Sequence, residues 1–189
     1  MRIGLVRHFP VKRGLPGKRV LTREELLQWS REYEASDIEV GNTDLLGINW
    51  KRFFSSDLQR AIKTAETICN GKITKMQELR EIPLSPVFRK NVRLHYVIWY
   101  ILIRFAVMFS HRSQAESKAA VEERVSRALD EILEIEEDAL IISHAAIMAF
   151  VRKELKRRGF SGPRLGTAEN GKVYVFEREM DEPLPEGAV

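Results

Sequence analysis

Apolar residues follow two alternating patterns along the chain. Short apolar runs bounded by polar or turn residues are typical of strands, and they occur at residues 3–6, 52–55, 139–143 and 173–176. Between these runs, apolar residues recur every three or four positions, as on the buried face of a helix. The predicted helices contain Leu26, Trp29 and Tyr33; Leu58, Ala61, Ala65 and Ile68; Val121, Val125, Ala128, Ile132 and Ile135; and Ile147, Val151 and Leu155. Thr22 with Glu25 three residues later predicts a capping box at the first helix, and we expect Ser56 or Asp57 to cap the second. A turn at Asn170-Gly171 precedes the last strand, and we expect a loose tail with Pro183 and Pro185 after it.

Strands that alternate with helices predict an α/β fold, here a three-layer sandwich in which helices flank a largely parallel central sheet. We expect a single domain over residues 1–189, because this length suits one core and no repeat or low-complexity linker divides the chain. Residues from about 84 to 113 interrupt the alternation. We expect this segment to form a cap-like insertion that lines the substrate side.

The insertion contains a largely apolar stretch, residues 92–109, that approaches the length of a membrane span. Arg93, His95 and Arg104 interrupt it, and charges near the centre of a bilayer are costly. We therefore expect a buried or groove-lining helix, and no membrane among the partners. A lid or a homodimer interface is the alternative for the same helix.

Composition limits the classes of function. Apolar residues make up 44 % of the chain and charged residues 31 %, which is typical of a globular protein. The net charge of +4 favours anionic partners, but no Lys/Arg stripe interleaved with aromatic residues points to nucleic acid, so a small anionic substrate fits better. A single cysteine, Cys69, excludes an intramolecular disulfide, and the N-terminus lacks the features of a signal peptide. We expect a cytoplasmic protein.

Two arginines and two histidines follow predicted strands. Arg7 and His8 come directly after residues 3–6, Arg60 lies in the first turn of a helix, and His144 follows another strand. Because ligands bind at the carboxyl ends of parallel strands, we expect these four side chains to lie together. Guanidinium groups and a helix N-terminus bind phosphate oxygens, and a neutral imidazole can attack phosphorus. The pattern predicts a phosphate site with His8 as the nucleophile.

A leaving alkoxide also needs a proton donor. Glu81, in a loop that contains two prolines, is the candidate, and Glu78 is the fallback. A metal site formed by His8, His144 and Asp57 is a weaker alternative, because no pair of histidines has the helical spacing of metal ligands.

Four motifs in order resemble the signatures of the histidine phosphatase superfamily, also called phosphoglycerate mutase-like. They are Leu5-Val6-Arg7-His8, Phe54-Ser55-Ser56-Asp57-Leu58-Gln59-Arg60-Ala61, Leu79-Arg80-Glu81-Ile82 and Ile141-Ile142-Ser143-His144. Glu116-Ser117 followed by Arg124-Val125 matches a further pattern of the family. The resemblance spans nearly the whole chain and implies a phosphoglycerate mutase-like fold.

The resemblance also implies roles for individual residues. His8 would carry the phosphoryl group, while Arg7, Arg60 and His144 would hold it. Glu81 would protonate the leaving group and then activate water, and no metal or organic cofactor is implied. The implied activity is phosphomonoester hydrolysis of a small phosphorylated substrate. The alternatives are a phosphoglycerate mutase-type phosphotransferase and a catalytically weak module that binds a phosphorylated ligand.

The chain departs from the family pattern beside the nucleophile, where Phe9 replaces the usual glycine. It also departs after Glu81, where two prolines replace a glycine-rich run. These changes motivate the binding-module alternative. A basic loop that contains Lys12, Arg13, Lys18 and Arg19 is either solvated or a second anion contact over the pocket. The apolar insertion leads us to expect a substrate with an apolar or aromatic group.

Overall fold

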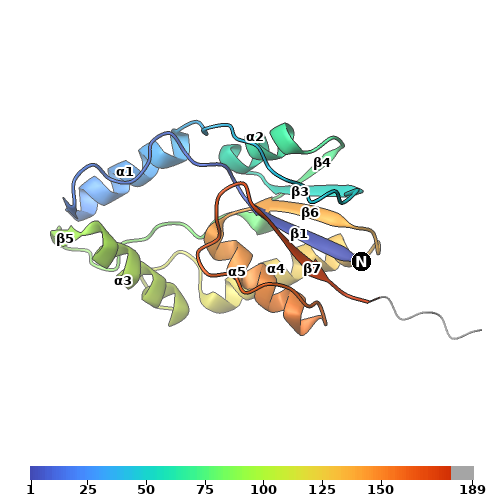
Figure 1. Cartoon of the computed structure of the whole chain (residues 1–189). Coiled ribbons are helices and arrows are strands. Elements are labelled where there is room, and N and C mark those ends of the chain that lie inside the picture. The colour runs from blue at the N-terminus through green and yellow to red at the C-terminus, as the bar shows by residue number, and fades with distance from the viewer. Residues whose placement is uncertain (180–189) are drawn as a thin grey trace, which may run out of the picture.

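A five-stranded central sheet organises the protein, whose computed structural model describes residues 1–179 (Figure 1). The strands are β1 (Arg2–Arg7), β3 (Arg52–Ser56), β4 (Ile73–Met76), β6 (Ala139–Ser143) and β7 (Val173–Glu177), in the order β4-β3-β6-β1-β7. β1, β3, β4 and β6 are parallel, whereas β7 runs antiparallel to β1. The expected, largely parallel sheet is confirmed. The sequence reading missed β4, an edge strand in which only Met76 is buried.

Helices cover both faces of the sheet, as expected for three layers. α2 (Gln59–Ile68) lies on one face, and α4 (Lys118–Leu133) and α5 (Ala145–Arg157) lie on the other (Figure 1). Successive residues of a strand point to opposite faces. Accordingly, Leu5 and Ile141 join the core beneath α4 and α5, whereas Val6 and Ile142 join the core beneath α2. The two central strands are therefore buried on both sides.

A smaller unit packs at the end of the sheet where β1 and β6 terminate. It contains α1 (Arg23–Ala35), α3 (Tyr96–Met108) and a two-stranded sheet of β2 (Val20–Leu21) and β5 (Leu94–His95). Thr22 and Glu25 form the predicted capping box of α1. The core of this unit consists of Leu21, Leu26, Trp99 and Ile103, and the indole N–H of Trp99 donates to the Leu21 carbonyl at 3.0 Å.

The apolar stretch at residues 92–109 therefore forms β5 and α3. The expectation was a buried or groove-lining helix. Trp99, Ile103, Ala106 and Val107 of α3 are buried and one side of the helix lines a cavity, but the face opposite the buried residues is exposed. Among the residues that the structure describes, no helix combines the length and the apolar character needed to cross a membrane. The predicted loose tail, with Pro183 and Pro185, lies outside the described residues.

Candidate active site

The four predicted phosphate-site residues meet at the carboxyl edge of the sheet. β1 pairs with β6 so that Arg7 lies opposite Ser143, and the His8 N–H donates to the Ser143 carbonyl at 3.0 Å. The rings of His8 and His144 are 5.1 Å apart between centroids. Arg60, from the first turn of α2, reaches His144 with its Nε 3.3 Å from the imidazole Nδ1. Sequence order and strand direction were thus sufficient to predict this convergence.

His8 is held in one tautomer. Its Nδ1 lies 2.6 Å from the Phe9 carbonyl oxygen, which can only accept a hydrogen bond, so Nδ1 carries the proton. The lone pair is therefore on Nε2. The pKa of His8 is lowered to about 3. Burial is the largest cause, the hydrogen bond to Phe9 opposes it in part, and the charges of Arg60 and Arg7 act in the same direction as burial. The imidazole is neutral at any working pH, as a nitrogen nucleophile must be.

His144 is nearly inaccessible, with 1 % of its surface exposed, and both ring nitrogens are engaged. Nδ1 accepts from Arg60, so the neutral ring carries its hydrogen on Nε2, which donates to Ser56 Oγ at 2.9 Å. Burial and the neighbouring positive charge of Arg60 hold the pKa of His144 well below its ordinary value. His144 therefore orients the Arg60 guanidinium. Ser56 lies in the motif at residues 54–61, but the sequence did not predict that it belongs to the site.

Arg7 has free hydrogen-bonding capacity in the site. Its Nη1 donates to the Ala168 carbonyl at 2.9 Å, while its buried Nε has no partner within residues 1–179. The loop before β7 fixes the backbone beside it, because the Gly171 N–H donates to the Arg7 carbonyl and the Asn170 side-chain amide donates to the His8 carbonyl at 2.5 Å. The sequence reading identified Asn170 only as part of a turn.

Phe9 does not face the phosphate-site residues. Its N–H donates to Thr64 Oγ1 at 2.9 Å, and its ring is buried against Gly41 and Gly171. A Cβ on Gly171 would lie 2.8 Å from the ring, and the backbone there has a φ of +69°, so both space and conformation require glycine. The ring thus occupies room that two glycines leave and braces the loops on either side of the Arg7–His8 pair.

Glu81 lies at the N-terminus of α5, next to the phosphate-site residues. Its Oε2 accepts from the Ala146 N–H at 3.3 Å and its Oε1 from the Ile82 N–H at 3.0 Å. Its negative charge also acts on the buried Arg60 guanidinium, whose pKa burial lowers. A carboxyl group beside the free amides of a helix and beside an arginine can exchange a proton with a bound substrate.

The segment before Glu81 is tied to three different elements. Arg124 of α4 donates to the Glu78 carbonyl, Ser143 Oγ of β6 donates to the Leu79 carbonyl at 2.9 Å, and Arg80 binds both carboxylate oxygens of Asp57. This anchoring fixes where Glu81 stands. Glu78, the fallback acid, contributes its backbone to the anchoring.

Glu116 and Arg124 form an ion pair that has a structural role. The two carboxylate oxygens of Glu116 accept from Nε and Nη2 of Arg124, each at 3.0 Å, and this paired geometry orients the guanidinium toward the Glu78 carbonyl. Sequence alone showed the spacing of these residues but not what the pair holds.

Asp57 serves the scaffold rather than a metal or a helix cap. Both of its oxygens are bound by Arg80 at 2.5 Å, which leaves the proposed set of His8, His144 and Asp57 without its carboxylate. The prediction that Ser56 or Asp57 caps α2 is wrong, because the N-cap is Leu58 and no side chain caps this end. The site residues Ser56 and Asp57 are engaged by His144 and Arg80 instead.

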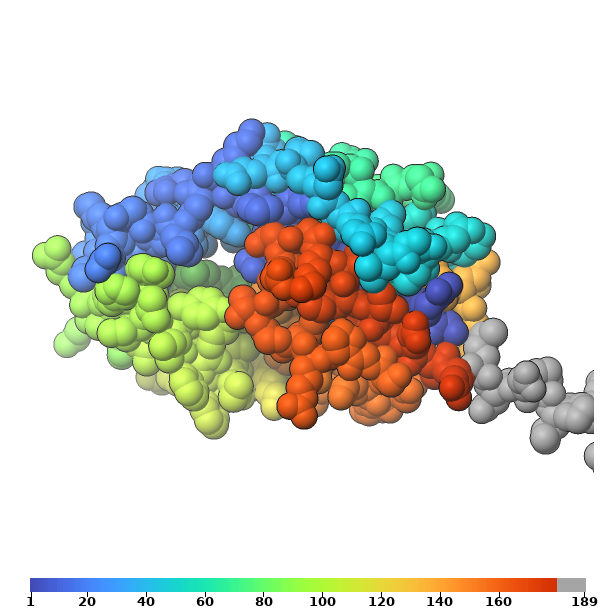
Figure 2. Space-filling view, viewed as in Figure 1, coloured from blue at the N-terminus to red at the C-terminus, as the bar shows by residue number. Residues whose placement is uncertain are grey.

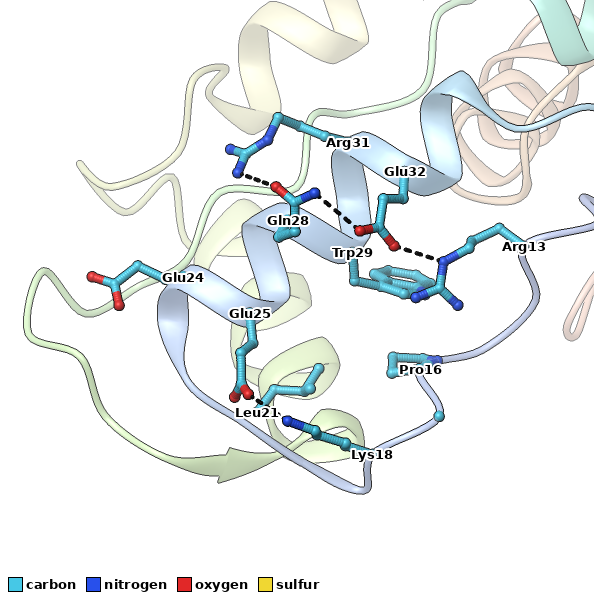
Figure 3. A pocket seen from close by; sticks show the side chains of 11 residues that line it. Arg13, Pro16, Lys18, Leu21, Glu24, Glu25, Gln28, Trp29, Arg31 and Glu32 are labelled. Atoms are coloured by element: carbon cyan, nitrogen blue, oxygen red, sulfur yellow. Dashed lines mark hydrogen bonds and ion pairs between the residues drawn. The ribbon is translucent and has the colours of Figure 1, made fainter.

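The basic loop is occupied by acidic partners from the neighbouring helix and the turn that follows it. Lys12 pairs with Asp37, Arg13 with Glu32 and Lys18 with Glu25, at 3.3, 2.8 and 3.0 Å. A cavity of about 610 Å³ lies between this loop and α1, and its charged side chains bind one another across it (Figure 3). None of the four phosphate-site residues lines it. The contacts favour the solvated-loop interpretation over a second anion contact.

A second cavity, of about 360 Å³, is lined by residues next to the phosphate-site residues, although those four residues do not line it themselves. Its lining includes Ile82, Ala145 and Ala168, which are neighbours in sequence or hydrogen-bond partners of Glu81, His144 and Arg7. Its far wall is the side of α3 that bears Tyr100, Arg104, Val107 and Met108. A substrate whose phosphate reached Arg7 and Arg60 would have a mostly apolar space for the rest of the molecule.

Comparisons with known proteins agree with this picture. The family model for the histidine phosphatase superfamily (branch 1) matches residues 42–186, which include Arg60, Glu81 and His144 and begin after Arg7 and His8. No curated protein matches the chain.

Solved structures share the fold. The protein TTHB049 from Thermus thermophilus is 23 % identical, with 93 % of this chain and 92 % of that chain covered and a TM-score of 0.55. The alpha-ribazole phosphatase from Shigella flexneri is 20 % identical, with 82 % and 79 % covered and a TM-score of 0.53. A mutant phosphoserine phosphatase from Entamoeba histolytica, in complex with phosphoserine, is 16 % identical, with 82 % and 80 % covered and a TM-score of 0.52. At these identities the likeness establishes the α/β architecture alone.

Proposed function

The chain belongs to the histidine phosphatase superfamily, and on that premise we propose that it is a phosphomonoesterase with His8 as its nucleophile. One observation carries the proposal. A neutral, buried imidazole has its Nδ1 proton committed to the Phe9 carbonyl and its Nε2 lone pair free, and it stands among arginines that match a phosphate.

In the first step, His8 Nε2 attacks phosphorus and the bond between phosphorus and the ester oxygen breaks. Arg7 and Arg60 hold the equatorial phosphoryl oxygens and stabilise their charge. His144 and Ser56 fix the orientation of Arg60 through the contacts at 3.3 and 2.9 Å, so the guanidinium does not have to reorganise during the reaction. The product is a phosphohistidine on His8.

Glu81 moves the protons. Its carboxyl group gives a proton to the departing alkoxide and then takes one from the water that attacks the phosphohistidine. This second attack releases inorganic phosphate and returns His8 to its neutral form. Atoms and charges balance without a metal or an organic cofactor. The position of Glu81 at the first amides of α5, on a segment tied down by Arg124, Ser143 and Asp57, supports this role.

The neighbouring cavity supports an apolar or aromatic leaving group. Most of its lining residues are apolar, and Tyr100 and Arg104 add an aromatic ring and a cation on one side. Aryl or long-chain alkyl phosphates should therefore be turned over with a higher kcat/KM than plain sugar phosphates. A preference of many-fold for sugar phosphates would contradict this part of the proposal.

The mutase-type phosphotransferase and the binding module can each be distinguished from a phosphatase. A mutase-type phosphotransferase would pass the phosphoryl group from His8 to a second hydroxyl, so it would isomerise phosphoglycerate without releasing phosphate. The binding module was motivated by Phe9 and by the two prolines after Glu81. The burial of the Phe9 ring between two glycines removes the first motive. Tight binding of phosphate without turnover of any ester would favour this alternative.

The test is hydrolysis of p-nitrophenyl phosphate in EDTA by the wild type, by His8→Ala and by a control, His111→Ala, whose side chain is exposed. We expect turnover that resists EDTA, a loss of about 10³-fold or more in His8→Ala, and no change in the control. Rapid quenching with labelled substrate should trap an acid-labile, alkali-stable phosphoenzyme in the wild type alone.

Two outcomes would contradict the proposal. Activity that EDTA abolishes would indicate a metal enzyme, and wild-type turnover by His8→Ala would exclude His8 as the nucleophile. Circular dichroism and the unfolding temperature establish that the His8 variant is folded, so that a loss of activity can be attributed to the chemistry.

A further inference from the structure

α3 presents an apolar face to the outside of the protein. Six side chains that share this face are between 41 % and 74 % exposed: Val97, Ile98, Ile101, Phe105, Met108 and Phe109. They follow the spacing of three and four residues that places side chains on one side of a helix, and the rings of Phe105 and Phe109 stack at 6.2 Å. α3 lies at the periphery, beyond the end of the central sheet (Figures 1 and 2). A contiguous face of this kind marks an interaction surface.

The segment that carries this face is strongly basic. Residues 84–118 contain six cations and one acid: Arg89, Lys90, Arg93, Arg104, Arg112 and Lys118 against Glu116. Glu116 is bound to Arg124 of α4, so it does not neutralise the segment. Within residues 1–179, none of the six cations forms an ion pair. By contrast, Lys12, Arg13 and Lys18 in the basic loop have acidic partners, and Arg19 is the one cation of that loop without an ion pair among the described residues.

The positive charge of residues 84–118 distinguishes between two possible partners of the exposed face of α3. A second copy of the chain, packed face to face, would bring two segments of net charge +5 together, and like charges at close range destabilise an interface. An anionic lipid surface would accept the apolar side chains into its interfacial region and attract the cations at the same time. Both features of the segment are then used by one partner.

The dimensions fit a helix that lies in the membrane interface. α3 has 13 residues and is therefore about 20 Å long, short of the roughly 30 Å of a bilayer's hydrocarbon core. One edge of the face, at Tyr100, Arg104 and Met108, also lines the cavity that adjoins Glu81 and His144. A lipid surface under α3 would therefore lie beside this cavity.

We propose that α3 and its flanking cations bind the surface of an anionic membrane peripherally, with the exposed apolar face of the helix in the interfacial region. This revises the expectation of no membrane partner, which considered only whether residues 92–109 could span a bilayer. The proposal concerns a surface and does not depend on the phosphatase mechanism.

Co-sedimentation of the full chain with vesicles tests it. Vesicles of phosphatidylcholine mixed with phosphatidylglycerol should bind the protein, and binding should weaken as salt is raised. The exchange Phe105→Asp with Phe109→Asp should reduce the bound fraction by about tenfold or more, and the triple exchange Arg89→Ser, Lys90→Ser and Arg93→Ser should do the same. Ile135→Asp is the matched control, because Ile135 is exposed to 51 %, close to the 55 % of Phe105, and lies past the end of α4.

The same experiment on the His8→Ala protein separates this proposal from the proposed function, because vesicle binding needs no turnover. Two results would overturn the proposal. One is the absence of binding to the anionic vesicles above the level of the Phe105→Asp, Phe109→Asp protein. The other is a dimer, detected by light scattering, that this double variant dissociates, since a second copy would then cover the face.

Discussion

Positive charge is concentrated in two regions of the protein. In one region it is buried and held in place, and in the other it is exposed. At the edge of the sheet, the Arg60 guanidinium is nearly inaccessible and is held by the neutral ring of His144, which Ser56 holds in turn. In the segment around α3, cations such as Arg89 and Arg93 are exposed and without ion pairs among the described residues, and the apolar side chains between them face outward.

Under the two proposals, the difference follows from the size of the partner. A small anion gives few contacts, so each charged group must be desolvated and fixed in place before the anion arrives. A buried charge persists only when neighbouring groups orient it, which explains the hydrogen bonds around Arg60. A broad surface gives many weak contacts instead, and solvated cations on long, flexible side chains can adapt to it.

The largest expected effect comes from the same substitution, arginine to methionine, made in each of the two regions. Arg60→Met should lower kcat/KM for p-nitrophenyl phosphate by about 10²–10³-fold, because a fixed cation at the developing phosphoryl charge is lost. Arg93→Met should leave that value unchanged and should weaken binding to anionic vesicles, which Arg60→Met should not. Similar kinetic losses in both variants would show that the two regions are not functionally distinct.

The burial of His8 predicts a pH dependence of stability. An ordinary histidine has a pKa of 6.5, whereas that of His8 is about 3, so between these values the unfolded chain binds a proton that the native protein excludes. The free energy of unfolding should therefore fall as pH is lowered from 6.5 toward 3, with no contribution from His8 above that range. Urea unfolding at pH 7 and pH 5 should show a loss about 2 kcal/mol larger in the wild type than in His8→Asn.

His111→Asn provides the control for this measurement, because it removes an exposed histidine and leaves His8 in place. If His8→Asn loses as much stability as the wild type between pH 7 and pH 5, then burial does not lower the pKa of His8 in the native protein.

The smallest effect is expected in the basic loop. Its cations are largely paired with acids, whereas those around α3 form no ion pairs among the described residues. Lys18 is paired with Glu25 at the surface, and exposed pairs of this kind contribute little. Lys18→Ala should change KM by less than about twofold and leave vesicle binding unaffected. A KM raised several-fold for a phosphorylated substrate, with kcat preserved, would instead show that this loop contacts the anion.

Much of the fold and the outline of the site could be predicted from the sequence. The runs at residues 3–6 and 139–142 are apolar throughout because both faces of a central parallel strand are buried. Helical spacing likewise located α4 and α5. Because parallel strands end at one edge, the order of the motifs was enough to bring Arg7, His8, Arg60 and His144 together.

The remaining features depend on contacts between residues far apart in the chain. Ser56 and Asn170 are functional neighbours of His144 and His8, although 88 and 162 residues separate the members of these pairs. The acidic partners of the basic loop are likewise a result of where α1 packs. A motif states which residues are present, but it does not state which hydrogen bonds they make.

α3 illustrates the limit of the sequence most clearly. It is apolar almost all round, so its pattern shows that a helix forms but contains no polar stripe to indicate which side faces outward. Packing against Leu21 and Leu26 settled this, because Trp99 and Ile103 turn toward that core and leave Phe105 and Phe109 outside. The sequence by itself determined the central strands, the main helices and the site residues that follow them, since these depend on local periodicity. The tertiary structure decided the tautomer of His8, the partners of each charge and the exposed face of α3, because these depend on which surfaces meet.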